Sequence, residues 1–152
     1  DAHILMVGQG PYLSHLKKLV EELNLVDHVS FIGRIQYAQL PQYICAGDIF
    51  AMPSRSRFFG LEVEGLGIVY LEASACGLPV IAGSSGGAPD AVLEGVTGIV
   101  VDGENNNEIA AAAIKLLNDL DGAKAMGLAG REWIIENWRW QIWSERFNKL
   151  LQ

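Results

Sequence analysis

Short apolar runs alternate with longer helical segments along most of this chain, and this alternation constrains its fold more than any other feature. Five runs have strand character, and each ends at or near glycine, proline or arginine. They are residues 2–7, 29–32, 49–52, 80–82 and 98–101. Strands that alternate with helices form parallel sheets, because each helix returns the chain to the same edge of the sheet. We therefore predict an α/β fold, a parallel sheet with helices on both faces.

The composition narrows the classes of partner. The chain has 152 residues, of which 50% are hydrophobic and 19% charged, which fits one domain with a sizeable core. Its formal net charge of −7 argues against a surface dedicated to nucleic acid or to an anionic membrane. No signal peptide and no apolar run of transmembrane length is evident, so we expect a cytoplasmic location.

The cysteines and histidines lack the spacing of a metal site. Cys45 and Cys76 lie in apolar segments without a CxxC pattern, and the three histidines are scattered over residues 3–28. We predict that both cysteines are reduced thiols in the core. We expect no cofactor and no essential metal.

The turns that follow the predicted strands carry the residues with the clearest chemistry. Ligands of parallel α/β sheets bind beyond the carboxyl ends of the strands. Four turns rich in glycine, proline or arginine occupy such positions: residues 8–10, 33–34, 53–67 and 84–87. We predict that they converge on one edge of the sheet.

The segment from residue 53 to 75 favours a sugar nucleotide as the ligand. Glu64 and Glu72 have seven residues between them, and a Gly-Leu-Gly turn separates Glu64 from a helix that we expect to begin at Ile68. Glu72 would then lie about 6 Å into the helix. The helix N-terminus offers N–H donors and positive potential for a diphosphate, and each glutamate offers acceptors for sugar hydroxyls. A solvated helix glutamate beside an acidic loop residue is the alternative.

Other motifs are less specific. The VGQGP segment, residues 7–11, lacks the third glycine of a dinucleotide fingerprint and has Pro11 where an N–H donor is needed. We therefore reject a hydride-transfer Rossmann enzyme. Gly86 and Gly87 fit either an anion-binding nest or a simple turn, and Arg55 and Arg57 fit either a phosphate contact or solvated side chains.

Together these motifs resemble the C-terminal, donor-binding half of retaining glycosyltransferases of family four, also called group 1, which have the two-domain GT-B architecture. The segments that carry the resemblance are residues 7–11 (VGQGP), 29–34 (VSFIGR), 53–82, 84–90 (SSGGAPD) and 94–102 (EGVTGIVVD). Residues 53–73 are particularly similar to GDP-mannose-dependent mannosyltransferases that act on phosphatidylinositol mannosides. The resemblance implies a Rossmann-like domain.

The resemblance also implies a role for individual positions. Glu64 would contact the transferred sugar as the catalytic residue, main-chain N–H groups near Gly67 would hold the diphosphate, and Glu72 would bind the ribose. Residues 33–35 would border the base pocket. The positions implied for donor binding are Gly33, Arg34, Ile35, Gly65, Leu66, Gly67, Ile68, Val69 and Glu72.

A further loop matches the family with one departure. Gly86 and Gly87 stand at the family's Gly-Gly loop, which makes them candidates for a phosphate loop, and Asp90 stands where glutamate is usual. The family's diphosphate-neutralising arginine and lysine precede the strand at residues 2–7 and are missing here. We expect residues 1–152 to be a donor-binding domain truncated at its N-terminus, inactive without the missing acceptor domain. Any peripheral membrane contact would belong to that missing half.

The predicted function is donor binding within a retaining hexosyltransferase, which moves a hexose, mannose in the favoured case, from a nucleotide sugar to an acceptor hydroxyl. GDP-mannose is the favoured donor. A UDP-sugar stays open, because guanine, uracil or adenine would fit the same glutamate pair. Two alternatives are a non-catalytic nucleotide-sugar-binding module and a GT-B nucleotide-sugar epimerase. No nucleic-acid partner is expected.

Overall fold

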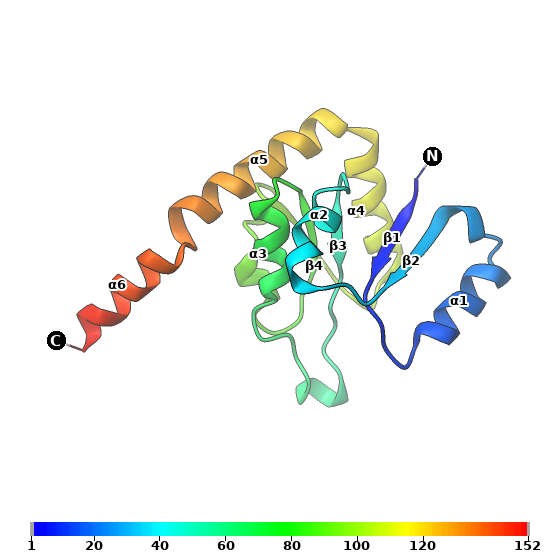
Figure 1. Cartoon of the computed structure of the whole chain (residues 1–152), viewed down its shortest axis with the longest axis horizontal. Helices are drawn as coiled ribbons and strands as arrows, with labels where there is room; N and C mark the ends of the chain where they lie inside the picture. The colour runs from blue at the N-terminus through cyan, green and yellow to red at the C-terminus, as the bar shows by residue number, and fades with distance from the viewer. Residues whose placement is uncertain (1, 152) are drawn as a thin grey trace. The chain divides into compact units, whose positions relative to one another are not determined.

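A computed structural model, shown in Figure 1, describes residues 2–151. The chain divides into two compact units, Asp1–Tyr43 and Ile44–Gln152. Both contain parallel strands and helices.

The first unit contains two parallel strands and one amphipathic helix. Its elements are β1 (Ile4–Val7), α1 (Leu13–Glu22) and β2 (Val29–Gly33). Ile4 lies opposite Val29 in the strand pair. All four β1 residues are exposed, Ile4 by 56%. A short apolar run such as residues 2–7 is typical of a buried parallel strand, but β1 is exposed here, because the short first unit leaves its two-stranded sheet largely uncovered.

The second unit contains a three-stranded parallel sheet. Its strands are β3 (Phe50–Met52), β4 (Val80–Gly83) and β5 (Gly98–Val101), in the order β3-β4-β5. β4 lies in the middle, and every one of its residues is buried. A short, continuous apolar run is typical of such a central parallel strand, since both of its faces are covered.

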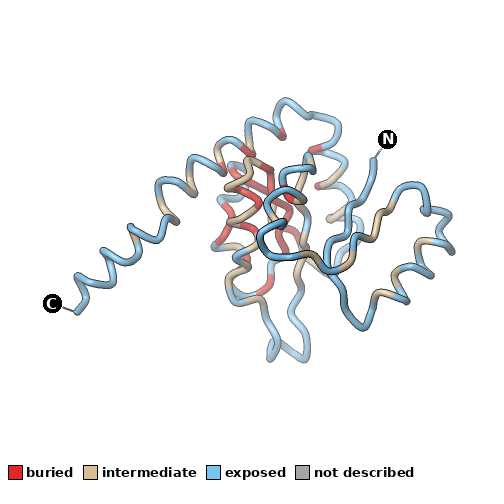
Figure 2. The backbone as a smooth tube through the Cα atoms, in the orientation of Figure 1, coloured by how far each residue is buried: buried red, intermediate tan, exposed pale blue. Residues whose placement is uncertain are grey.

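Helices cover both faces of this sheet. The helices are α3 (Ile68–Ala75), α4 (Asn106–Asn118) and α5 (Leu120–Asn137). Figure 1 shows α3 and α4 on opposite sides of β4, and α5 packs against both helices. Buried residues gather on β4 and the surrounding elements (Figure 2). One core cluster consists of Ile81, Val101, Ala112, Leu116 and Ala123.

The described residues contain two further α-helices. They are α2 (Leu40–Ile44) and the C-terminal α6 (Trp140–Leu150). The rings of Trp133, Trp138 and Trp143 form consecutive contacts, with centroids 5.7 Å apart in each pair. Within residues 2–151, none of the helices has both the length and the apolar character needed to span a bilayer.

The predicted class, α/β with parallel strands, is confirmed. Each predicted strand is present within two residues of its expected bounds, and α3 begins at Ile68 as predicted. The strands form two sheets instead of the single sheet expected, because β1 pairs with β2 while β4 pairs with β3 and β5. Strand pairing depends on residues far apart in sequence, which an apolar run does not specify.

The two cysteines correct another prediction. Cys45 is exposed and Cys76 is half-buried, so Cys45 is not a core thiol. Burial, together with the neighbouring Cys45 thiol, raises the pKa of Cys76 to about 12. Cys76 therefore stays protonated at neutral pH.

Candidate functional site

The loop between β3 and α3 is anchored at its start by Tyr70. The hydroxyl of Tyr70 donates to the carbonyl oxygen of Met52 at 2.7 Å and lies 3.0 Å from Ser54 Oγ. The residue is fully buried. Burial raises the pKa of Tyr70, and the charge of Glu64 raises it further, while the hydrogen bond with Ser54 lowers it. Because the net shift is upward, the phenol remains protonated and keeps its hydrogen bond to Met52.

Two glycines allow this loop to approach the ends of the neighbouring strands. A Cβ atom at Gly83, the last residue of β4, would collide with the backbone of Ser54. A Cβ at Gly103, just beyond β5, would collide with the carbonyl oxygen of Ser54 as well. The carboxyl ends of β3, β4 and β5 therefore meet at one edge of this sheet, as predicted for residues 53–67 and 84–87.

The backbone of Glu64 is held by the turn that follows β4. Ser85 Oγ accepts a hydrogen bond from the N–H of Glu64 at 3.2 Å, and the N–H of Gly87 donates to the carbonyl oxygen of Glu64 at 3.0 Å. Ser85 Oγ also lies 3.1 Å from Ser56 Oγ. Ser85 is buried, so this serine joins both ends of the loop from within.

Gly86 and Gly87 lie against the same stretch of backbone. A Cβ at Gly86 would collide with the carbonyl oxygen of Glu64, and a Cβ at Gly87 would collide with that of Gly65. Gly86 has a φ of +53°, whereas Gly87 does not have a positive φ. Since the N–H of Gly87 is engaged with Glu64, the geometry supports a turn that positions the Glu64 loop.

The N-terminus of α3 has the features of an anion-binding helix end. Gly67 precedes the helix with a φ of +75°, and a Cβ there would collide with the Tyr70 ring. No side chain caps this end. The first N–H groups of a helix have no acceptor within the helix, and they carry the positive end of its dipole. Ile68 is 67% exposed, so this helix end is open to solvent.

The two glutamates lie before and within this helix start. Glu64 lies on the preceding loop, Glu72 lies in α3, and both are half-buried. A carboxylate accepts hydrogen bonds through two oxygens, which suits a pair of adjacent sugar hydroxyls. The second unit therefore offers N–H donors for phosphate and carboxylate acceptors for hydroxyls.

The tip of the loop has its own internal contacts. Arg57 and Glu62 form an antiparallel bridge and an ion pair with an Nη1–Oε2 distance of 3.5 Å. The Arg57 guanidinium also lies over the Phe58 ring, 5.1 Å from its centroid. Arg57 is thus engaged within the loop tip.

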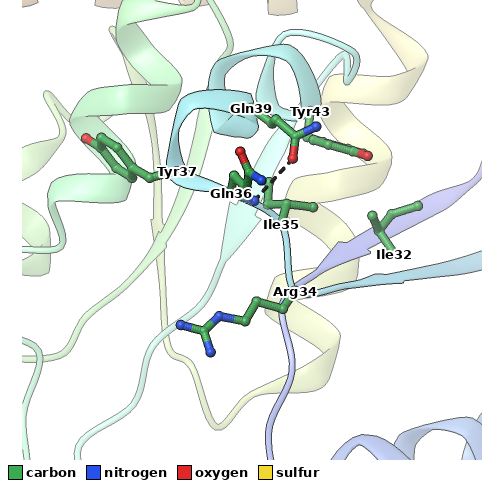
Figure 3. Close-up of a pocket in the computed structure, with 7 residues that line it drawn as sticks. All are labelled: Ile32, Arg34, Ile35, Gln36, Tyr37, Gln39 and Tyr43. Atoms are coloured by element: carbon green, nitrogen blue, oxygen red, sulfur yellow. Dashed lines mark hydrogen bonds between the residues drawn. The ribbon is translucent and has the colours of Figure 1, made fainter.

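The first unit has a surface cavity beside the end of β2. Its volume is about 770 Å³. Gly33, at the end of the strand, has a φ of +79°, and its carbonyl oxygen accepts a hydrogen bond from the N–H of Gly8 at 2.8 Å. Arg34 and Ile35, two of the three residues predicted to border a base pocket, line this cavity, whereas Gly33 is outside its lining (Figure 3). The remaining lining residues are Ile32, Gln36, Tyr37, Gln39 and Tyr43.

The sequence did not point to several of these residues. Ser85 and Tyr70 act through contacts 21 and 18 positions away in sequence, and only the folded chain reveals them. Gln36 and Gln39 come shortly after the predicted base-pocket residues. Polar side chains are common on turns, however, so nothing in the sequence distinguished these two glutamines as candidate ligand contacts. Among residues 2–151, no cluster of three or more His, Cys, Asp or Glu is arranged to hold a metal ion.

Comparison with known proteins identifies the family. The family described as glycosyl transferases group 1 matches residues 1–133. The chain belongs to this family. It is 50% identical over 151 residues to a GDP-mannose-dependent alpha-(1-6)-phosphatidylinositol monomannoside mannosyltransferase of Mycolicibacterium smegmatis, covering 99% of this chain and 40% of that protein. The chain therefore spans about 40% of the length of this curated relative.

Solved structures agree with the family fold. A sucrose-phosphate synthase from Thermosynechococcus elongatus has a TM-score of 0.83 and 32% identity over 97% of this chain and 37% of its own. The C-terminal domain of a group 1 glycosyltransferase from Francisella tularensis has a TM-score of 0.74 and 24% identity over 87% of this chain and 66% of its own. The expected fold, the C-terminal portion of a GT-B glycosyltransferase, is confirmed.

Proposed function

We propose that this chain is the donor-binding part of a retaining mannosyltransferase that uses GDP-mannose. The observation that carries the proposal is the helix start at Gly67 and Ile68, which has open N–H donors and a glutamate on each side along the sequence. The mycolicibacterial relative is named as GDP-mannose-dependent and is 50% identical, which supports mannose and guanine over the UDP-sugars. By the same likeness, the acceptor class proposed for the whole protein is a phosphatidylinositol mannoside.

The proposed donor contacts follow the chemistry of each group. The N–H groups of residues 65–69 bind the diphosphate, Glu72 binds the ribose hydroxyls, and Glu64 binds the hydroxyls of the transferred sugar. Residues 33–35 provide contacts to the base. Gly86 and Gly87 act by holding the backbone of Glu64, with which they are in contact.

The proposed reaction needs stabilisation of the departing nucleoside diphosphate. Negative charge develops on that group as its bond to the sugar breaks, and pre-oriented N–H donors stabilise such charge. The acceptor hydroxyl attacks from the face that the diphosphate leaves, which retains the anomeric configuration. Glu64 orients the sugar through its hydroxyls and is not assigned as a covalent nucleophile. We propose that no essential metal takes part.

The 152 residues are proposed to bind the donor without transferring sugar, since an acceptor domain is needed for turnover. We also propose a cytoplasmic location for the protein, because its two cysteines have no disulfide pattern. A transfer assay on a longer protein that includes the acceptor domain distinguishes a transferase from a binding module. An epimerase would release an epimer in the absence of acceptor.

The first test is competitive saturation-transfer NMR of the 152-residue chain with GDP-mannose, UDP-glucose and UDP-N-acetylglucosamine. We expect GDP-mannose to bind preferentially, and Glu72→Ala to weaken binding at least tenfold by removing the ribose contact, worth about 1.5–3 kcal/mol for charged hydrogen bonds. Glu132→Ala, an exposed glutamate on α5, is the matched control. Equal loss in both variants, or unchanged binding in Glu72→Ala, would reject the ribose assignment. Preference for a UDP-sugar would retain a donor site but reject GDP-mannose.

A further inference from the structure

Two side chains that line the first-unit cavity, Arg34 and Gln39, have N–H groups that can donate hydrogen bonds to a ligand. Arg34 lines the cavity, and a guanidinium has five N–H donors and no acceptor. Gln39 also lines it, and its Oε1 accepts a hydrogen bond from the N–H of Gln36 at 3.2 Å. A backbone N–H can donate only to the oxygen of an amide, so this contact fixes which end of the Gln39 side chain is which. The Nε2 of Gln39 is the end left for a ligand.

The arrangement of Gln39 is part of the local fold. Gln36 and Gln39 form a capping box around the 3-10 turn Tyr37–Gln39, which leads directly into α2. Figure 3 shows the two glutamines beside each other with Tyr43 next to Gln39, while Tyr37 points away from them. The turn therefore holds the Gln39 amide in one orientation at the cavity.

Carboxylates are absent from the lining, which restricts how a base can be recognised. The seven lining residues include no aspartate or glutamate. Guanine presents two adjacent acceptors, O6 and N7, on one edge, whereas adenine presents the N7 acceptor beside an N6 amino donor. A pyrimidine such as uracil offers the single O4 acceptor on the corresponding edge. The donor groups of guanine on its pairing edge, N1–H and the 2-amino group, would need acceptors that a carboxylate best supplies.

We infer that Gln39 is a specificity-determining residue that selects guanine by donating from Nε2 to its O6 and N7 edge. The inference rests on the proposed donor site and deepens it, because it assigns the choice of base to one side chain of the cavity. It also states which edge of the base is read. Inosine has O6 and N7 but lacks the 2-amino group, so it is recognised as guanine is.

The test is a set of NMR titrations of the 152-residue chain with GDP, IDP, ADP, UDP and 7-deaza-GDP. GDP and IDP are expected to bind within twofold of each other and at least tenfold more tightly than ADP, since a good pair of hydrogen bonds gives about 1–3 kcal/mol of base discrimination. The 7-deaza analogue, which lacks the N7 acceptor, binds more weakly than GDP. The side-chain NH₂ signals of Gln39 shift with GDP and not with ADP.

One substitution isolates the donor. Gln39→Glu retains an oxygen for the N–H of Gln36, so the capping box survives, while the ligand-facing donor becomes an acceptor. The GDP-to-ADP affinity ratio is expected to fall at least fivefold, because a carboxylate accepts from the adenine amino group and repels O6. Gln42→Glu makes the same charge change on α2 at an exposed residue outside the cavity lining, and leaves the ratio unchanged.

The outcomes separate this inference from the proposed function. Four results would overturn the role of Gln39 and leave donor binding intact. They are weak binding of IDP relative to GDP, equal binding of ADP and GDP, tighter binding of UDP than of GDP, and the same GDP-to-ADP affinity ratio in both glutamate variants. Failure of every nucleoside diphosphate to bind contradicts the donor site and the inference together.

Discussion

The backbone of Glu64 is held by Ser85, which lies 21 positions away, and by Gly87 on the same turn. These contacts fix the main chain on both sides of the Glu64 side chain without using the carboxylate. A residue proposed to orient a sugar needs this kind of support, because a small displacement of the loop would move its oxygens out of hydrogen-bonding range. Gly86 and Gly87 permit these contacts because neither has a Cβ atom, which would collide with the backbone of residues 64–65.

Replacing Gly87 with alanine tests that support. The added Cβ would collide with the carbonyl oxygen of Gly65, so either the loop before α3 or the turn after β4 must shift. We expect a loss of about 1–3 kcal/mol in the free energy of unfolding, measured by urea denaturation, and weaker binding of GDP-mannose. Gly47→Ala is the control, because its Cβ would make only ordinary contacts beyond 3.4 Å. Wild-type stability and binding in Gly87→Ala would show that the Glu64 loop does not depend on this packing.

At the scale of elements, the loop tip between β3 and α3 has an unusual backbone. Phe58 and Phe59 have φ values of +49° and +55°, which side chains with a Cβ rarely adopt. The side chain of Phe59 is fully exposed, so no packing compensates this strain. The bridge between Arg57 and Glu62 closes the tip and holds it in this conformation.

We expect Phe59→Asn to stabilise the chain by about 0.5–1 kcal/mol, because asparagine tolerates the left-handed conformation at lower cost. Leu61→Asn is the matched control, since Leu61 is also exposed, by 89%, but has a negative φ of −76°. Urea denaturation of the three proteins measures the difference. Destabilisation by Phe59→Asn, or an equal effect in both variants, would show that relief of backbone strain is not the cause.

The elements differ in how well the sequence specified them. The bounds of α3 were predictable because Gly67 precedes its first residue and Gly77 follows its C-terminus, both with positive φ. The contact of Ser85 with Glu64 and the orientation of Gln39 were not predictable, because each depends on a specific three-dimensional approach or turn geometry. The division of the strands into two sheets depended likewise on long-range pairing.

At the scale of the whole molecule, the two units differ in how their strands are protected. β4 is paired on both edges and completely buried, whereas β1 is paired with β2 and exposes all of its side chains. Local opening costs less free energy where few apolar contacts are lost. The strands of the first unit should therefore open without unfolding of the second.

Hydrogen exchange tests this difference. We expect the amide protons of β1, after correction for intrinsic rates, to be at least tenfold less protected than those of β4, a difference of about 1.4 kcal/mol or more in opening free energy. Protection of β4 should equal the global unfolding free energy from urea denaturation. Saturating GDP-mannose should raise protection of the second unit, which contains the proposed diphosphate and ribose contacts, since a ligand stabilises every element that must be folded to bind it. Equal protection of β1 and β4 in the free chain would instead mean that the two units unfold as one cooperative structure.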